Sequence, residues 1–160
     1  MLKLTRHFAH PPEDVFRALS EAEEWAKWMG PAGFSVTECI MGRRIGDAWR
    51  ATMRSPEGVI NTVKGVRREF VPPRRLAFTW QWQGRNGEPD GVETLVTIDL
   101  VPEGKGTRMN FLHTGFESET ARDLHAQGWN GSFDKLEAWR PPEFFTRFIP
   151  NPEPRTRNSL

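Results

Sequence analysis

One histidine, His113, is placed where a side chain could take part in binding or catalysis. It ends a strand-like segment in which Met109 and Phe111 precede it at intervals of two residues. Because side chains alternate between the two faces of a strand, His113 shares the apolar, inward face with these residues. A neutral imidazole donates one hydrogen bond and accepts another. His113 could therefore cap the strand end on a backbone carbonyl, orient a ligand, or act as an acid–base group, and we favour these roles in that order.

A charged cluster, Arg67-Arg68-Glu69, is the second candidate. It lies in a segment where apolar and polar residues do not alternate regularly, so that a bulge could intervene. A solvated outer face is the favoured interpretation of this cluster. If Glu69 or one arginine faces inward, it needs a partner such as His113 or an acidic ligand group, because an uncompensated buried charge is costly.

A metal site and a catalytic nucleophile have less support in the sequence than a binding role for His113. His7 and His10 form an H-x-x-H, but the pair straddles a predicted strand end, and zinc needs at least one further ligand. Cys39, the single cysteine, has no identified histidine partner and is interpreted as a small buried thiol. The sequence contains no G-x-S-x-G and no phosphate-binding glycine loop. We therefore predict no catalytic residue, no metal ion and no cofactor.

The aromatic content is unusual, with seven tryptophans, eleven phenylalanines and no tyrosine. Tryptophan is difficult to pack perfectly but forms good walls for an apolar cavity, and a tryptophan-rich core without a cavity is the alternative. The 160 residues, 37% hydrophobic and 27% charged, otherwise suit one soluble globular domain. A net charge of +1 and the absence of a long apolar run predict no nucleic-acid partner and no membrane insertion. The single cysteine fits a cytoplasmic protein.

The elements that must position these residues follow from periodicity, caps and turn signals. An opening strand is followed by two short helices, the first of which begins at Pro11-Pro12. Six strands and one long helix come next. The predicted strands cover residues 34–40, 47–54, 59–70, 76–82, 91–101 and 107–113, and the long helix covers residues 117–139.

Four of the strands offer one apolar and one polar face, which is typical of an antiparallel sheet that is solvated on one side. The long helix, with apolar residues at spacings of three and four, is expected to cover the other side. Gly128 interrupts this helix at a cost of roughly 1 kcal/mol against alanine. Such a glycine is more easily explained if something approaches the helix at that position.

The order of one strand, two short helices, six strands and a long helix is the helix-grip arrangement. On four stretches the chain resembles START-like (SRPBCC superfamily) proteins related to the C-terminal domain of the activator of Hsp90 ATPase. The four matching stretches are residues 28–34 (WMGPAGF), 65–76 (GVRREFVPPRRL), 113–116 (HTGF) and 128–129 (GW). The resemblance implies an α+β, START/Bet v 1-like fold over residues 1–140, in which a curved antiparallel sheet of six or seven strands wraps around the C-terminal helix. Residues 141–160 are predicted to form a proline-rich tail.

The resemblance also implies a cavity between the sheet and the long helix. Periodicity independently directs apolar side chains from several strands and from the helix into that space, with Trp28 and Phe34 closing its mouth and His113 as its polar group. The predicted ligand-binding residues are Trp28, Phe34, Trp49, Met53, Phe78, Trp80, Trp82, Val96, Phe111, His113, Trp129 and Phe133.

The function we predict is the binding of a hydrophobic small molecule or lipid in this cavity. Two alternatives stay open. One is a cyclase-like or hydrolase-like enzyme that uses His113 as an acid–base group, which we favour less than a binding module. The other is an Hsp90 co-chaperone-like interaction protein, whose support is the resemblance alone. The sequence leaves open whether the protein forms a homodimer.

Overall fold

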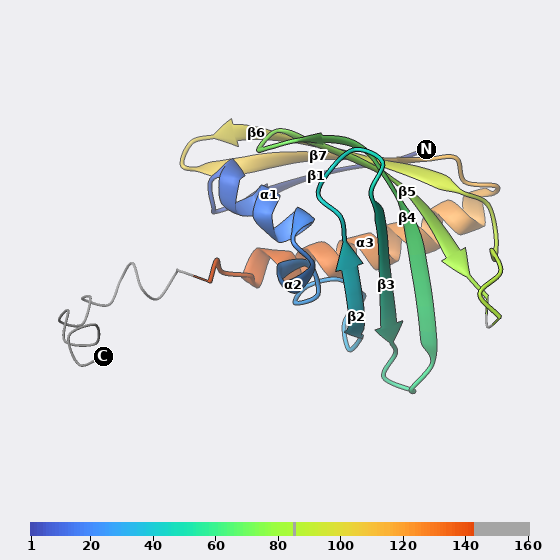
Figure 1. The fold of residues 1–160 in the computed structure, drawn as a ribbon. Coiled ribbons are helices and arrows are strands. Elements are labelled where there is room, and N and C mark those ends of the chain that lie inside the picture. The colour runs from blue at the N-terminus through green and yellow to red at the C-terminus, as the bar shows by residue number, and fades with distance from the viewer. Residues whose placement is uncertain (85, 143–160) are drawn as a thin grey trace, which may run out of the picture.

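Among the described residues, seven strands form one antiparallel sheet in the order β1-β7-β6-β5-β4-β3-β2 (Figure 1). The computed structural model describes residues 1–84 and 86–142, so the predicted tail lies outside the described residues from residue 143 onward. The strands are β1 (Leu2–Phe8), β2 (Ser35–Met41), β3 (Ala48–Arg54), β4 (Ile60–Val71), β5 (Arg75–Gln83), β6 (Thr94–Glu103) and β7 (Gly106–Thr114). The predicted helix-grip arrangement, with two short helices after the first strand, is confirmed.

Three helices in residues 1–84 and 86–142 accompany the sheet, and α3 (Glu119–Ala138) runs beneath its concave side (Figure 1). The first helix, α1 (Pro12–Ser20), begins where proline fixes a helical backbone angle, and acidic residues in its first turn complement the helix dipole. The second, α2 (Ala22–Trp25), is a single turn. The long helix starts two residues later than predicted because Ser118 is its cap, and the hydroxyl of Ser118 accepts from the Ala121 N–H at 3.0 Å.

The predicted alternation is confirmed in β3 and β6, where every second side chain is buried. It fails in the middle of β5, because Ala77 and Thr79, assigned to the polar face, are also buried. Both side chains are short, and β5 is flanked by β4 and β6, so the neighbouring strands cover them. The Thr79 hydroxyl accepts from the backbone N–H of Val66 in β4 at 2.8 Å.

The bulge considered for β4 is present, because the register with β5 shifts between Arg67 and Glu69. The shift turns Arg67 inward, where it is 2% exposed, and leaves Arg68 on the surface. The solvated outer face favoured for all three residues is therefore wrong for Arg67. Glu69 instead accepts from Arg75 at 3.0 Å on the surface.

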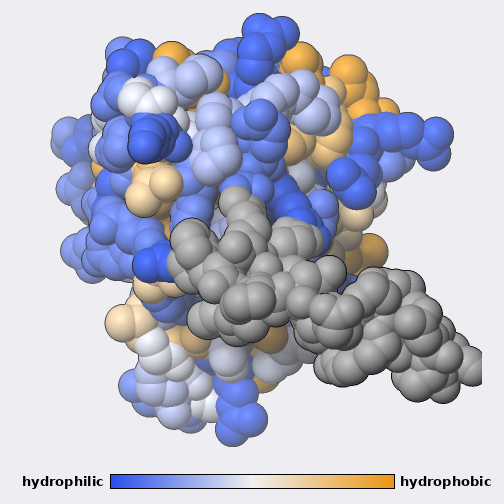
Figure 2. Space-filling model, turned by 90° about the vertical axis from the view of Figure 1, so that its left-hand side faces the viewer, coloured by the Kyte–Doolittle hydropathy of each residue, from blue (hydrophilic) through white to orange (hydrophobic). Residues whose placement is uncertain are grey.

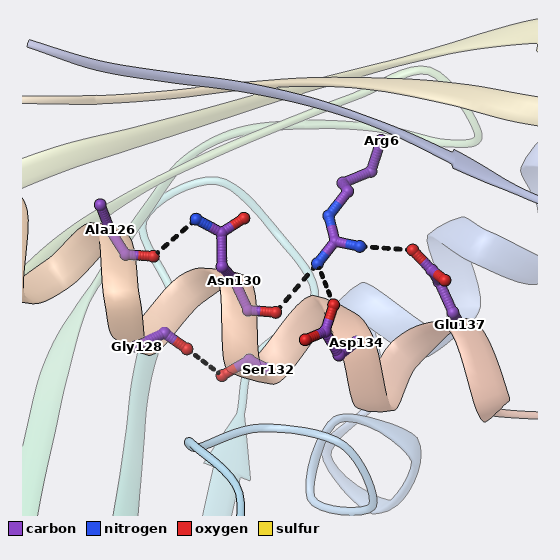
Figure 3. A network of polar contacts seen from close by, with 7 residues as sticks. All are labelled: Arg6, Ala126, Gly128, Asn130, Ser132, Asp134 and Glu137. Carbon is purple, nitrogen blue, oxygen red and sulfur yellow. Dashed lines mark hydrogen bonds and ion pairs between the residues drawn. The ribbon is translucent and has the colours of Figure 1, made fainter.

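Arg6 ties the edge strand β1 to α3 (Figure 3). Its guanidinium donates to the Asn130 carbonyl at 2.9 Å, to Asp134 at 2.6 Å and to Glu137. The cation also lies 5.9 Å from the centre of the Phe133 ring. Arg6 is thus one of the side chains that hold α3 against the sheet, together with the aromatic residues that the helix carries.

The face of the molecule that is visible around the grey atoms in Figure 2 is mostly hydrophilic, with hydrophobic residues in separate small groups. Within residues 1–84 and 86–142, no helix is long and apolar enough to cross a membrane.

Candidate binding cavity

A cavity of about 390 Å³ lies between α3, the strands β3 to β5 and the loop that precedes β2. Sulfur-containing and aromatic side chains form most of its apolar wall, which consists of Met29, Phe34, Met53, Trp80, Trp82 and Trp129. Aromatic and thioether groups suit flat apolar ligands because they offer large, polarisable surfaces.

The cavity is lined by some of the predicted ligand-binding residues but not by all of them. Five of the predicted ligand-binding residues line it: Phe34, Met53, Trp80, Trp82 and Trp129. The other seven are buried in the packed core and do not line the cavity: Trp28, Trp49, Phe78, Val96, Phe111, His113 and Phe133. The interior beneath the sheet is therefore filled by rings, and the hollow lies toward one side of it.

The loop from Met29 to Phe34 is fastened to α3 at the cavity wall. The Gly30 N–H donates to the Ser132 hydroxyl at 2.9 Å. The ammonium group of Lys135 reaches the carbonyls of Met29, Pro31 and Phe34 at 3.3, 3.4 and 3.4 Å, and burial lowers the pKa of this lysine. These contacts make the loop a fixed part of the wall.

Two glycines allow this loop to approach its neighbours. Gly30 and Gly33 adopt φ angles of +97° and +86°, a region that disfavours residues with a Cβ. A Cβ on Gly30 would lie 2.9 Å from Phe34 Cβ, and one on Gly33 would lie 2.8 Å from Pro56 Cγ. The glycines in the stretch WMGPAGF are thus required by backbone geometry.

Gly128 lies on the cavity side of α3, and a Cβ placed on it would have no atom within 4 Å. This helix-interior glycine therefore borders open space. Gly131, one turn further on, has the Cα of Pro31 3.3 Å from its Cβ position, so it accommodates the loop.

His113 is fully buried, and both of its ring nitrogens are hydrogen-bonded. The indole N–H of Trp129 donates to Nδ1 at 3.1 Å. Nε2 therefore carries the proton of the neutral ring and donates to the Thr94 hydroxyl at 2.7 Å, which in turn donates to the Trp80 carbonyl at 2.9 Å. Burial, and secondarily the nearby His125, lowers the pKa of His113 to about 3. The ring is a satisfied structural element of the core and does not contact Glu69 or any arginine at hydrogen-bond distance.

His125 lines the cavity and is not among the predicted ligand-binding residues. Its Nδ1 donates to the Ala121 carbonyl at 2.7 Å, and its Nε2 accepts from the Trp82 indole at 3.1 Å. The available signal was its spacing, because His125, Gly128 and Trp129 share one side of a helix at intervals of three and four. Of the other polar lining residues, Ser132 also belongs to α3, whereas Asn61, Gln83 and Asp90 come from strand ends and a loop that show no such periodicity.

The described part of the chain, residues 1–84 and 86–142, has no group of three or more His, Cys, Asp or Glu side chains that could hold a metal ion. His7 lies 3.8 Å from Glu103, and His10 contacts the Trp139 carbonyl at 3.2 Å, so these two histidines have separate surroundings. Burial raises the pKa of the half-buried Cys39 thiol to about 12, although nearby Arg67 opposes the shift. That thiol is not activated as a nucleophile.

The seven-stranded antiparallel sheet, the two short helices after its first strand and the long C-terminal helix define the helix-grip class of proteins. The chain belongs to the family described as activator of Hsp90 ATPase homolog 1-like proteins, whose model matches residues 9–139. No curated protein matches the sequence significantly.

Solved structures of bacterial proteins share the fold. The AHSA1 protein from Silicibacter pomeroyi has 29% sequence identity and a TM-score of 0.79, over 86% of this chain and 94% of its own. A protein from Chromobacterium violaceum has 26% identity and a TM-score of 0.77, with the same two coverages. A protein from Nitrosomonas europaea has 28% identity and a TM-score of 0.72, over 86% of this chain and 91% of its own. The match to nearly the whole length of each relative supports the helix-grip assignment.

Proposed function

We propose that the protein binds a flat, apolar small molecule in the cavity between α3 and strands β3 to β5. The observation that carries the proposal is the open space of about 390 Å³ beside Gly128, walled by aromatic and thioether groups. Burial of apolar ligand surface there contributes about 25 cal/mol per Å². The wall is held by hydrogen bonds, from the Gly30 N–H to Ser132 and from Lys135 to the Met29 carbonyl, which reduces the ordering cost of binding.

The test compares two leucine variants at consecutive positions of α3. Gly128→Leu places a side chain in the cavity, whereas Gln127→Leu adds the same side chain at an exposed position outside the lining. Binding is followed with N-phenyl-1-naphthylamine, a neutral probe whose emission rises in apolar surroundings. We expect the unaltered protein and Gln127→Leu to bind it equally, and Gly128→Leu to bind at least about tenfold more weakly, the loss of roughly 1.4 kcal/mol.

Circular dichroism and thermal unfolding establish that both variants remain folded. Equal binding by Gly128→Leu would place the probe elsewhere and contradict the cavity assignment. No binding by the unaltered protein of this probe, of fatty acids or of polycyclic aromatic compounds would remove the proposal.

A second candidate rests on the family description, which names an activator of Hsp90 ATPase. If the chain acts on a chaperone in this way, its addition should raise the ATPase rate of Hsp90 from a bacterial source. An unchanged rate at saturating protein would eliminate this candidate without bearing on the cavity.

A further inference from the structure

Three tryptophans line the cavity, and their indole N–H groups differ in whether they have a hydrogen-bond acceptor. Trp82 donates to His125 at 3.1 Å, and Trp129 donates to His113 at 3.1 Å. Trp80 lies between them, with ring centroids 5.6 Å from Trp82 and 4.8 Å from Trp129. Among the described residues, Trp80 Nε1 is the one buried side-chain nitrogen or oxygen without a hydrogen-bond partner.

An unpaired buried donor is unusual, because it has lost its hydrogen bonds to water and gained none in return. The other two tryptophans in the same wall both have an acceptor, which is a histidine nitrogen in each case. A ligand that brings an acceptor to Trp80 gains a hydrogen bond in an apolar site without having to break an existing one.

Trp80 lies where a ligand group could come close to it. It lines the cavity and also an adjoining pocket of about 80 Å³, and Trp82 and His125 line both spaces. Trp82 is half-buried and joined to α3 by its one bond to His125. Because Trp80 Nε1 is buried, a ligand acceptor can reach it only if a neighbouring side chain moves, and the half-buried Trp82 is the neighbour whose movement the inference requires.

The charge of the lining indicates which acceptor suits the cavity. Asp90 contributes a carboxylate, and no lysine or arginine among the described residues lines the space. Arg85 lies outside the described residues. A neutral acceptor is favoured over an anionic one, because a buried anion would need a cationic partner.

We propose that the ligand of this cavity is a flat, neutral molecule with a carbonyl oxygen that accepts the indole N–H of Trp80. This inference rests on the proposed function and adds the chemical class of the ligand and the residue that selects it.

The test uses fluorenone and fluorene, two tricyclic probes of the same shape that differ by a carbonyl in place of a methylene group. Their dissociation constants are measured by calorimetry for the unaltered protein, Trp80→Phe and Trp82→Phe. We expect the preference for fluorenone over fluorene to fall about tenfold in Trp80→Phe. Trp82→Phe removes an indole from the same wall, but its N–H is already bonded, so the preference should be kept although both affinities fall.

A spectroscopic measurement tests the contact without any variant, in case Trp80→Phe does not fold. The carbonyl stretch of fluorenone bound to the unaltered protein should move to lower frequency than in a hydrocarbon solvent. A stretch that stays at the hydrocarbon position would overturn the inference, and the N–H of Trp80 would then be assigned to a ring face such as that of Trp82, which is nearly perpendicular to it at 88°.

The outcomes separate this inference from the proposed function. If both probes bind the unaltered protein but the preference is unchanged in Trp80→Phe, or falls equally in Trp82→Phe, the carbonyl assignment is overturned and apolar binding stands. If neither probe binds the unaltered protein, both are overturned.

Discussion

The indole N–H of Trp129 donates to Nδ1 of His113 at 3.1 Å, so the middle of α3 is bonded to the end of β7. Protonation of His113 would place an N–H donor opposite this indole donor and remove the contact. Burial already disfavours the charged ring, and the pKa of His113 is lowered to about 3. The pair thus couples the position of the helix to a neutral histidine.

This coupling predicts a pH-dependent stability. The folded-state pKa of about 3 lies below the ordinary value of 6.5, so the unfolded chain binds more protons between these values. The contribution of neutral His113 is fully present above pH 6.5 and is lost progressively as the pH falls toward 3. Urea unfolding of the unaltered protein between pH 7.5 and pH 5 should show a fall in unfolding free energy of up to about 1.4 kcal/mol per pH unit below 6.5.

His113→Asn supplies the comparison, because the amide oxygen can still accept from Trp129 but does not titrate in this range. Its unfolding free energy at pH 7.5 should be lower, and its dependence on pH between 7.5 and 5 should be shallower. His7→Asn, at a half-exposed position of β1, should keep the slope of the unaltered protein. Equal slopes in the unaltered protein and His113→Asn would contradict the assignment of a buried neutral ring.

The second prediction concerns the contacts by which Arg6 holds α3 against β1 (Figure 3). Arg6→Met keeps most of the aliphatic stem but removes the contacts to Asn130, Asp134 and Glu137. Because the carboxylates are exposed, each ion pair is weak, and we expect a combined loss of about 1–2 kcal/mol in unfolding free energy. The measurement is urea unfolding at low and high salt, with a smaller loss expected at high salt.

Arg108→Met is the matched control on the neighbouring strand. Arg108 pairs with Glu103 at 2.8 Å, but both side chains are more than two-fifths exposed and the ion pair joins β7 to β6. The unfolding free energy of Arg108→Met should fall by no more than about 0.5 kcal/mol. A similar loss for the two variants would show that contact with the helix adds nothing to the role of Arg6.

A third prediction concerns the loop at the cavity wall. Gly30→Ala and Gly46→Ala both place a Cβ at a positive φ, +97° and +91°. They differ in surroundings, because a Cβ at residue 30 would lie 2.9 Å from that of Phe34, whereas one at residue 46 has no atom within 4 Å. We expect both variants to lose about 1 kcal/mol through backbone strain, and Gly30→Ala to lose about 1–3 kcal/mol more through overpacking. Equal losses in thermal unfolding would indicate that the loop moves aside freely.

Much of this fold was predictable from the sequence, because binary patterning determines which side of each strand faces the core. Trp49 and Met53 in β3 and Val96 in β6 are buried as the period of two predicts. The inward turn of Arg67 was only partly predictable, because the irregular alternation of residues 67–69 indicated a bulge but not which of the three side chains the bulge turns inward. The burial of Ala77 and Thr79 likewise depends on the pairing of β5 with β4 and β6, which the alternation within β5 does not describe.

The cavity was less predictable than the fold, because periodicity identifies inward side chains but not the space between them. Phe111 and Trp129 both point inward, yet their centroids lie 4.8 Å apart, so they pack against each other, and only Trp129 reaches the cavity. Whether two rings touch or enclose a space depends on rotamers and on the position of α3. Gly128 was the one local feature of the sequence that indicated the cavity, since a glycine is costly inside a helix and this one lies on the side of α3 that faces open space.

The last prediction concerns Arg67, which is buried and makes its contacts to neutral groups. Its guanidinium donates to the carbonyls of Gly42 at 3.1 Å and Ser20 at 3.3 Å, and it lies 5.6 Å from the centre of the Phe78 ring. Burial lowers the pKa of this arginine to about 10, so the group stays charged at neutral pH. The planar guanidinium can reach two carbonyls and a ring at once, which a lysine ammonium cannot.

Arg67→Lys should therefore lower the unfolding free energy at pH 7 by about 2–3 kcal/mol, because a more strongly hydrated charge is buried with fewer partners. Arg68→Lys, at the exposed bulge position, should change it by less than about 0.5 kcal/mol. Burial would also lower the pKa of the introduced ammonium group below that of the unfolded chain, so the deficit should shrink as the pH rises from 7 toward 10. A deficit that is the same at pH 7 and pH 10 in urea unfolding would mean that the new amine reaches water, and that Arg67 is held by its position more than by its charge.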